Sequence, residues 1–340
     1  MLDNFSDRLS NASSRLIELI HKFDRAKVLV VGDLTLDEFL TGQVERISRE
    51  APVLIVRHEG TKQVPGGGAN AIYNLAKLGA KVIAVGIIGN DDRGQAIKTI
   101  FTEAGINTSG IFVDSDRPTV TKTRISAHAR QSVTQQIVRI DRKSDVPISP
   151  ALQQQIAEFI TANIDKVDAI VCSDYGEGVM TKMVIAAALK HNLVIVDAQK
   201  DLHRYQSATI FTPNLPEAEL AVGYGISEAN LKTASQDLLK LTNAKQILIT
   251  RGEDGMSLSG KDGTELHIPA FNRTQVFDVT GAGDTVVAAL TSALANGSSF
   301  WEAAVLGNLA ASIVVRQFGT TTTNPTEMLT ALENLLSQED

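Results

Sequence analysis

The chain has 340 residues, of which 43% are hydrophobic and 21% are charged, and its formal net charge is −7. These fractions are ordinary for a soluble globular protein, and the acidic balance argues against a nucleic-acid-binding protein that relies on a basic surface. No apolar run approaches the ~18 residues of a membrane span, and the single cysteine, Cys172, rules out a disulfide framework. We therefore expect a cytoplasmic protein with no nucleic-acid partner and no membrane partner.

The N-terminal segment, residues 1–26, is predicted to be a helical extension that packs on the rest of the protein. Apolar residues recur in it at roughly helical spacing, at Leu9, Ile17, Ile20 and Phe23.

From residue 27 onward, short apolar strands alternate with amphipathic helices. Strands are predicted at residues 27–33, 81–89, 169–175, 193–198, 209–214 and 246–252, and helices at 69–79 and 92–105. Continuous apolar strands with helical connections are typical of a mainly parallel sheet that carries helices on both faces. The sequence thus predicts one doubly wound α/β domain over residues 27–340.

Two segments, at about residues 38–65 and 111–141, interrupt this rhythm. Both alternate apolar and polar residues with a period of two and contain no long helix, which is typical of half-exposed antiparallel strands. We expect them to pair into a small β-sheet lid over the carboxyl ends of the main strands, where ligands bind in open α/β folds. An exposed sheet of this kind also favours a homodimer in which a second subunit covers the lid.

The segment DVTGAGDTVVAAL, residues 278–290, is the most informative motif of the chain. Its small residues let the backbone approach a ligand, and the helix that follows directs unpaired N–H groups and a partial positive charge toward that ligand. Gly281, Ala282 and Gly283 are therefore candidates for binding a phosphoryl group in transfer. Asp284 is the candidate general base for an attacking hydroxyl. A capped helix start with no catalytic role is the alternative interpretation.

Polar residues near the first strand are candidates for binding a sugar. Asp33 and Asp37 follow that strand, and carboxylates accept hydrogen bonds from hydroxyl groups. The segment PGGGAN, residues 65–70, lets a ligand lie against Gly66 and Gly67 and offers the amide of Asn70. Turn and cap chemistry explains the same residues without a ligand.

Cations in the second predicted lid segment are candidates for binding an anionic group of the substrate. Lys122 and Arg124 are two residues apart and share one strand face, and Arg139 and Arg142 lie nearby. A solvated strand face is the alternative.

Two later strand ends are candidates for the phosphate donor. Asn214 and Glu217 in TPNLPEAE supply oxygen ligands suited to a hydrated Mg²⁺, although an Asx turn with an acidic first helical turn looks the same. Thr250, Gly252 and Gly255 in TRGEDG are suited to lie beneath nucleotide phosphates.

Taken in order, GDLTLD, PGGGAN, SDYGEGV, TPNLPEAE, TRGEDG and DVTGAGDT resemble the motifs of the ribokinase-like, or phosphofructokinase-B, carbohydrate kinases. The resemblance covers about residues 27–320 and implies ATP and Mg²⁺ as cofactors. It implies that Asp284 is the base and that Asp37, Gly66, Gly67 and Asn70 hold the sugar. It further implies substrate contacts by Asp174, by Asp33 and by Lys122, Arg124 and Arg139, and a nucleotide site that includes Asn308. Asp278 and Thr280 match positions that bind a monovalent cation in many members, so the resemblance also implies K⁺.

Within that family, VERISREAPVLIV, TVTKTRI, QQIVRID and SDYGEGV resemble the kinases that phosphorylate D-glycero-β-D-manno-heptose 7-phosphate at O1, a step toward lipopolysaccharide. Some of these kinases are followed by a cytidylyltransferase domain. Because this sequence ends at Asp340, we expect the stand-alone form. Glu177 replaces a usual lysine, and Ala198–Gln199 replaces a usual Pro–Lys. A kinase for another sugar, sugar phosphate or nucleoside therefore stays open, as does a non-catalytic sugar-binding protein on the same scaffold.

Overall fold

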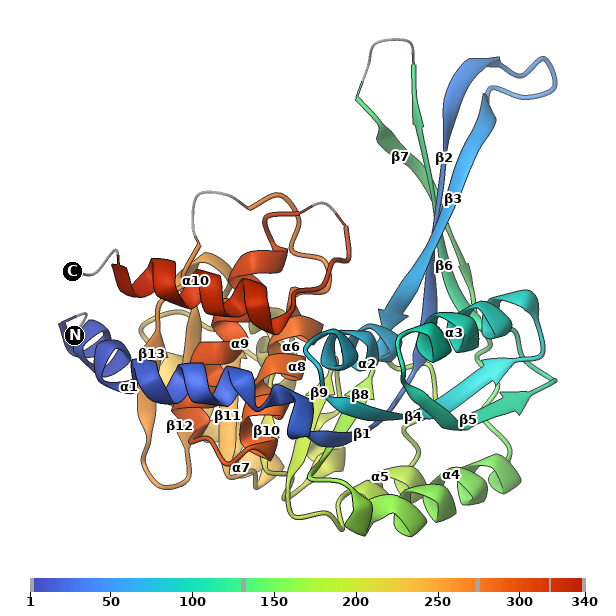
Figure 1. Ribbon diagram of the computed structural model, residues 1–340. Coiled ribbons are helices and arrows are strands. Elements are labelled where there is room, and N and C mark those ends of the chain that lie inside the picture. The colour runs from blue at the N-terminus through green and yellow to red at the C-terminus, as the bar shows by residue number, and fades with distance from the viewer. Residues whose placement is uncertain (1–2, 130–132, 273–275, 318, 338–340) are drawn as a thin grey trace.

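The computed structural model describes residues 3–129, 133–272, 276–317 and 319–337. Residues 1–2, 130–132, 273–275, 318 and 338–340, which belong to the predicted extension, lid segment and main domain, lie outside the described residues. Within the described part, one nine-stranded sheet forms the body of the molecule and a four-stranded sheet stands out from it (Figure 1).

The large sheet is doubly wound and mainly parallel, as the sequence predicted. Its strand order is β13-β12-β11-β10-β9-β8-β1-β4-β5, and the pairs from β5 through β11 are parallel. The last two strands extend it in antiparallel fashion beyond β11. The strands are β1 (Lys27–Gly32), β4 (Lys81–Gly89), β5 (Asn107–Asp114), β8 (Ala169–Asp174), β9 (Val194–Ala198), β10 (Ile210–Phe211), β11 (Gln246–Thr250), β12 (Met256–Gly260) and β13 (Glu265–Ile268).

Helices cover both faces of this sheet and divide the apolar core in two. Along β1, Val28 and Val30 point into one core cluster, whereas Leu29 and Val31 point into the other, because neighbouring strand residues face opposite sides. The first cluster is covered by α1 (Asp3–His21), α2 (Gly68–Lys77), α3 (Asp92–Glu103), α8 (Ala282–Ala295), α9 (Phe300–Val314) and α10 (Pro325–Ser337). The second is covered by α4 (Pro150–Asn163), α5 (Lys182–Ala188), α6 (Leu215–Val222) and α7 (Leu231–Thr242).

The small sheet, here called the lid, has the strand order β3-β2-β6-β7. Its strands are β2 (Leu34–Ile47), β3 (Leu54–Gly67), β6 (Val120–His128) and β7 (Gln135–Arg142). The prediction of a second, smaller sheet is confirmed, but two details of it are wrong. The central pair, β2 and β6, is parallel, because each strand leaves the body in the same direction. Residues 111–114 belong to β5 of the large sheet, where their apolar side chains extend the edge beside β4.

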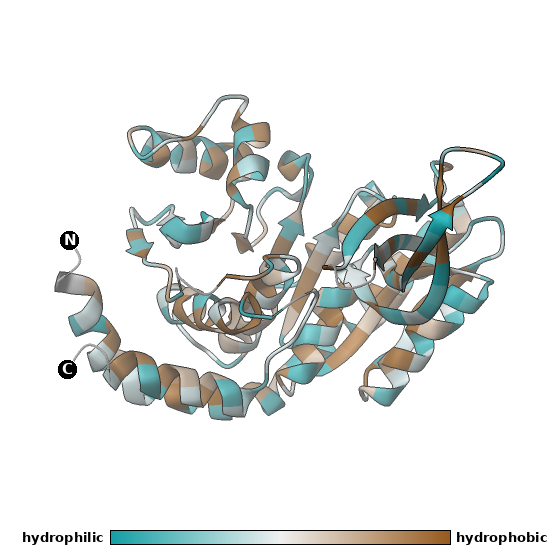
Figure 2. Ribbon diagram, turned by 90° about the horizontal axis from the view of Figure 1, so that it is seen from above, coloured by the Kyte–Doolittle hydropathy of each residue, from teal (hydrophilic) through white to brown (hydrophobic). Residues whose placement is uncertain are grey.

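The N-terminal segment forms α1, which lies along the body next to α10 (Figure 1). Figure 2 shows hydrophobic residues concentrated in the strands of the large sheet. None of the helices in the described ranges is both long enough and apolar enough to cross a membrane.

Candidate active site

Asp284 lies in the first turn of α8, at the centre of the molecule. The helix begins after Gly281, whose φ of 79° is in the left-handed region that favours glycine. A Cβ added to Gly281 would lie 2.8 Å from Nδ2 of Asn70, so this turn requires glycine for space as well. The N–H of Ala282 donates to the carbonyl of Val279 at 3.2 Å and is engaged within the turn, whereas a Cβ on Gly283 would meet open space.

Two side chains hold the Asp284 carboxylate. Asn70 Nδ2 donates to Oδ2 at 2.7 Å, and the Tyr175 hydroxyl donates to Oδ1 at 2.9 Å. Asn70 is fixed in turn by Asn74, which donates to its side-chain and backbone oxygens, and Thr285 donates to Asn74. The predicted sugar-binding residue Asn70 therefore lies at Asp284.

Burial raises the pKa of Asp284 to about 6, and the negative charge of Asp37 contributes to the rise. The hydrogen bonds from Asn70 and Tyr175 and the charge of Lys122 oppose it. A carboxylate whose pKa lies near neutrality is suited to accept a proton from a hydroxyl and to release it again.

Asp37 lies beside this carboxylate, at the base of the lid on β2. Its Oδ1 forms an ion pair with Nη1 of Arg124 at 2.9 Å, and its side chain is almost fully buried. A Cβ on Gly66 would lie 2.7 Å from Cγ of Asp37, and Gly67 has a φ of 53°. The glycines predicted to hold the sugar thus let β3 pass close to Asp37 and turn into α2.

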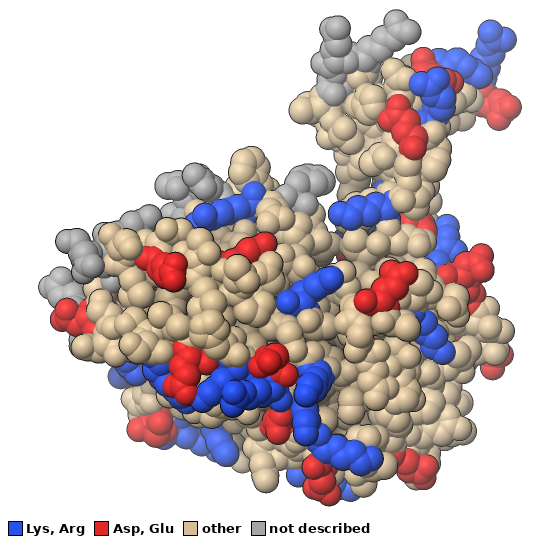
Figure 3. Space-filling model, in the orientation of Figure 1, with Lys and Arg blue, Asp and Glu red and all other residues tan. Residues whose placement is uncertain are grey.

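A cleft of about 740 Å³, here called the lid cleft, separates the inner face of the lid from the body. Figure 3 shows the lid standing clear of the body, with Lys and Arg side chains at its base. The cleft is lined from the lid by Phe39, Thr41, Gly60, Thr61, Lys62, Val64, Arg124, Ser126, Thr134 and Gln136, and from the body by Asp278, Thr280, Gly319 and Thr320.

The predicted cations have separate environments. Arg124 lines the lid cleft and lies 5.2 Å from the centre of the Phe39 ring. Lys122 lies two residues nearer the body on the same strand, and its Nζ is 5.7 Å from the centre of the Tyr175 ring. Arg139 pairs with Arg124 in the sheet register and is bound through two nitrogens to Asp141. Arg142 instead donates to Thr123, beside Glu38, and so does not join the other three.

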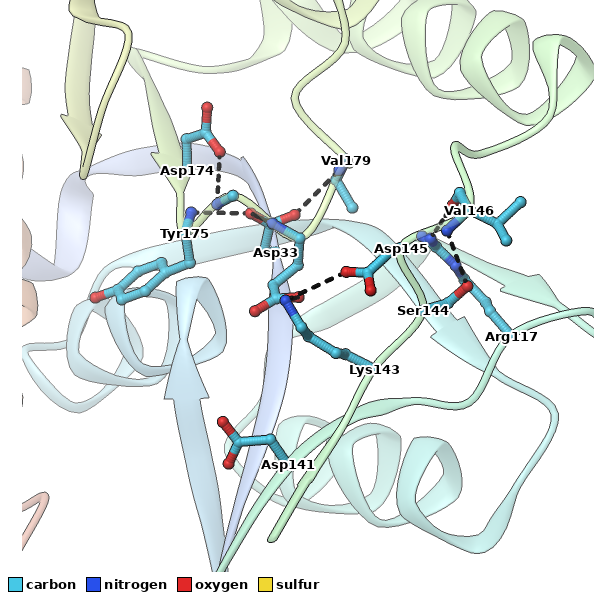
Figure 4. Close-up of polar contacts among 12 residues, drawn as sticks. Asp33, Arg117, Asp141, Lys143, Ser144, Asp145, Val146, Asp174, Tyr175 and Val179 are labelled. Carbon is cyan, nitrogen blue, oxygen red and sulfur yellow. Dashed lines mark hydrogen bonds and ion pairs between the residues drawn. The ribbon is translucent and has the colours of Figure 1, made fainter. Parts of the chain in front are cut away.

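The carboxylates of two predicted substrate ligands, Asp33 and Asp174, accept hydrogen bonds from other groups of the protein. The Asp33 carboxylate accepts backbone N–H groups from Tyr175, Glu177 and Val179, at 2.8 to 3.1 Å (Figure 4). Asp174 accepts from the Gly176 N–H, the Arg204 guanidinium and the Tyr205 hydroxyl. Both buried carboxylates thus satisfy N–H groups of the loop after β8, and their role as substrate ligands stays a prediction.

The predicted nucleotide-binding residues lie at the ends of β10 and β11. Asn214 and Glu217 form a capping box at the start of α6, each side chain bonded to the other residue's N–H at 2.9 Å. Thr250 forms a bridge to Asn214, so these two strand ends adjoin. Gly252 and Gly255 both have positive φ in the turn that leads to β12, and Asn308 on α9 donates to the carbonyl of Pro269.

Two residues near Asp284, Tyr175 and Asp197, were not among the predicted site residues. Tyr175 contacts Asp284, as described above. Asp197, at the end of β9, lies near Asp284 and Glu217, whose negative charges add to burial in raising its pKa well above the ordinary value. The position of Asp197 at the carboxyl end of a buried strand is a signal that the sequence offers for it.

The loop before α8 is pinned by Asp278. Its carboxylate accepts from the N–H of Thr280 at 2.9 Å and from that of Gly319 at 3.1 Å. These bonds, together with the nearby charge of Arg124, lower the pKa of Asp278 in spite of its partial burial.

A doubly wound sheet, a projecting β lid and a buried aspartate at a glycine-rich helix start together define a carbohydrate kinase. Residues 25–327 match the pfkB family carbohydrate kinase, and the chain therefore belongs to this family.

The chain is also similar to particular family members. It is 42% identical over 330 residues to the bifunctional protein HldE of Pelobacter propionicus, which covers 95% of this chain and 66% of that protein. For the bifunctional protein HldE of Desulfatibacillum aliphaticivorans the identity is 41%, with coverage of 93% and 66%. The chain thus spans just under two thirds of the length of these relatives.

Solved structures show the same fold. Arabidopsis thaliana ribokinase complexed with ribose and ATP has a TM-score of 0.71 at 20% identity, over 91% of this chain and 99% of that one. Escherichia coli phosphofructokinase-2 in complex with potassium has a TM-score of 0.72 at 18% identity, with the same coverage.

Proposed function

We propose that this carbohydrate kinase transfers the γ-phosphoryl group of ATP to O1 of D-glycero-β-D-manno-heptose 7-phosphate and forms the 1,7-bisphosphate. The observation that carries the proposal is the location of Asp284 between the helix start of α8 and the cationic base of the lid. The resemblance to HldE proteins supports the heptose pathway. The lid cleft, with Arg124 and Lys62 in its wall, supports an acceptor that already carries a phosphate.

The reaction in this proposal is an in-line displacement. The sugar hydroxyl loses its proton to Asp284, its oxygen bonds to the γ-phosphorus, and the bond from that phosphorus to ADP breaks. The dipole of α8 and the N–H groups of Gly281 and Gly283 stabilise the charge on the phosphoryl oxygens, whereas the N–H of Ala282 is bound to Val279. Asp37 and Asn70 orient the hydroxyl.

ATP and Mg²⁺ fit the residues at the ends of β9, β10 and β11. Oxygen donors are the ligands that Mg²⁺ prefers, and Asp197 and Glu217 supply two carboxylates there. Mg²⁺ keeps several of its waters, so the proposed ion would be held largely through water. Bound Mg²⁺ would neutralise phosphate charge. Thr250, Gly252, Gly255 and Asn308 would line the nucleotide, and a K⁺ ion at Asp278 and Thr280 remains part of the proposal.

A kinase for a different sugar is the second candidate, and Glu177 favours it. This side chain lies 3.9 Å from Lys143, at the loop that also carries Tyr175 (Figure 4). An anion at this loop opposes an anionic acceptor unless Lys143 neutralises it.

The test is ADP release with Mg-ATP and a panel of heptose 7-phosphate, fructose 6-phosphate, fructose, ribose and adenosine. Turnover on heptose 7-phosphate that is lost in Asp284→Asn supports the full proposal. Turnover on another acceptor keeps the mechanism and replaces the substrate. Near-wild-type turnover by Asp284→Asn would contradict the role of Asp284.

We also propose a homodimer formed through the lid. An apolar row crosses its outer face at Leu40, Ile125 and Val138, and Val138 and Ile140 on the edge strand β7 are more than 40% exposed. A second copy of the lid would cover both this row and the free edge. Sedimentation at micromolar concentration should give a dimer for the wild type and a monomer for Val138→Lys, and a monomeric wild type would contradict the proposal.

A further inference from the structure

Tyr175 lies on the loop between β8 and α5 and reaches the reacting carboxylate directly. Its hydroxyl donates to Oδ1 of Asp284, while Asn70 on α2 donates to Oδ2. Each oxygen of the carboxylate is thus held by a different donor, and the two donors come from different elements. A carboxylate held at both oxygens has one orientation.

The loop that carries Tyr175 is itself anchored. Three of its backbone N–H groups, at residues 175, 177 and 179, donate to the carboxylate of Asp33, which is only 1% exposed. Figure 4 shows Asp33 enclosed by this loop and the Tyr175 ring directed away from it. The buried carboxylate therefore fixes the backbone from which the tyrosine extends.

Lys122 of the lid contacts the ring of the same tyrosine. Nζ of Lys122 on β6 lies 5.7 Å from the centre of the Tyr175 ring, within the range of a cation–π interaction. Tyr175 thus contacts both a lid cation and the carboxylate of Asp284.

We propose that Tyr175 is a positioning residue for Asp284: its hydroxyl fixes the orientation of the carboxylate, and the loop anchored by Asp33 holds the tyrosine in place. The inference rests on the proposed role of Asp284 as general base. An acceptor hydroxyl must meet the carboxylate in its ionised form and in one orientation, and the Tyr175 bond serves both needs.

The substitution Tyr175→Phe tests this by removing a single oxygen. The pKa of Asp284 should rise, because the lost hydrogen bond favours the ionised form. A bond to a charged group is worth enough for kcat to fall about 10- to 100-fold, with KM for ATP unchanged. The acidic limb of the pH–rate profile should move to higher pH.

The matched control is Tyr205→Phe. Tyr205 also donates its hydroxyl to a buried carboxylate at the end of β8, Asp174, but that carboxylate does not contact Asp284. This variant should leave both the kinetics and the pKa of Asp284 unchanged. Thermal unfolding checks that both variants fold, and Asp33→Asn, which weakens the loop anchor, is a second variant that should raise the same pKa.

The deciding readout needs no sugar substrate. The ¹³C carboxyl resonance of Asp284, assigned by its loss in Asp284→Asn, can be titrated in wild type, Tyr175→Phe and Tyr205→Phe. A rise confined to Tyr175→Phe supports the proposal, whereas no rise, or an equal rise in Tyr205→Phe, overturns it. If the wild type phosphorylates none of the sugars, the proposed function fails while the titration still decides the role of Tyr175.

Discussion

The burial of the Asp284 carboxylate lowers the stability of the folded protein at neutral pH. Water is excluded from its carboxylate, and burial raises the pKa from 3.8 to about 6. The folded protein therefore binds the proton more tightly than the unfolded chain does. The contribution of this group to stability is highest at low pH and falls as the pH rises from about 4 to 6.

The substitution Asp284→Asn should therefore stabilise the protein above pH 6 while it abolishes most activity. A shift of this size corresponds to about 3 kcal/mol, which sets the order of magnitude of the gain. The new amide can accept from Asn70 and donate to the Tyr175 oxygen, so the local bonds persist. Urea unfolding at pH 7.5 should show the larger free energy in the variant, and at pH 4 the two proteins should be similar. A variant less stable than wild type at pH 7.5 would contradict this account.

Gly281 is a second residue whose identity the local geometry dictates. In Gly281→Ala, the left-handed φ and the close approach of Asn70 should together lower the free energy of unfolding by about 1 to 3 kcal/mol. The activity should fall too, because Asn70 holds Asp284.

Gly283→Ala is the matched comparison for Gly281→Ala. A Cβ there meets open space, and alanine in a helix is favoured over glycine by about 0.5 to 1 kcal/mol. Thermal unfolding should rank Gly283→Ala at or above the wild type and Gly281→Ala below it. Equal stabilities of the two variants would show that the left-handed turn does not require glycine.

The local surroundings of a residue could be predicted most directly where its partners are close in the sequence. The Gly-rich turn and Asp284 form one continuous motif, and the position of Asp284 in the first turn of α8 follows from it. Asp33 and Asp174 look the same in sequence as Asp37, because all three follow apolar strands. Their structural environments differ. N–H groups of the loop at residues 175–179 donate to Asp33 and Asp174, whereas Asp37 forms an ion pair with Arg124.

At the scale of elements, the parallel strands of the body follow from continuous apolar runs that are buried on both faces. The strand pairing of the lid was harder to predict, because period-two alternation indicates a strand but neither its partner nor its direction. The parallel pairing of β2 with β6 joins segments about 85 residues apart, as the register of Glu38 with Thr123 shows. The antiparallel edge strands β12 and β13 were not predicted, since their short runs are interrupted by turn residues.

In the proposed function, Arg124 on the lid binds the anionic group of the acceptor. The substitution Arg124→Gln should raise KM for a phosphorylated acceptor by about tenfold or more, because it removes a charge-assisted hydrogen bond. KM for ATP should not change. Arg57→Gln is the matched control, since Arg57 is an exposed lid arginine bonded to Gln43. Initial-rate kinetics on both variants measure this, and an equal effect of the two substitutions would argue against a specific phosphate contact.

At the scale of the whole molecule, the apolar core links the site to the N-terminal helix. The cluster on one face of the large sheet includes Leu16 of α1 together with Val286 and Leu290 of α8. Phe5 of α1 also packs on Phe271 and Trp301, with ring centres 5.9 and 6.2 Å apart. Helix α8, which begins at the glycine-rich turn, and the N-terminal helix α1 thus belong to one packed unit.

Leu16→Ala should therefore destabilise the whole molecule and not α1 alone. Leu16 is fully buried, and truncation of a buried leucine costs about 2 to 5 kcal/mol through lost contacts and the cavity that remains. Ser14→Ala, at an exposed position of the same helix, should change the free energy of unfolding by no more than about 0.5 kcal/mol. Because the core is shared, thermal unfolding of Leu16→Ala followed by circular dichroism should remain a single transition at a lower temperature. The ADP-release rate at 25 °C should be unchanged, since α1 packs mainly on α10 and α9 and not on the turn that carries Asp284. An early, separate transition would instead mean that α1 unfolds independently of the core that supports the site.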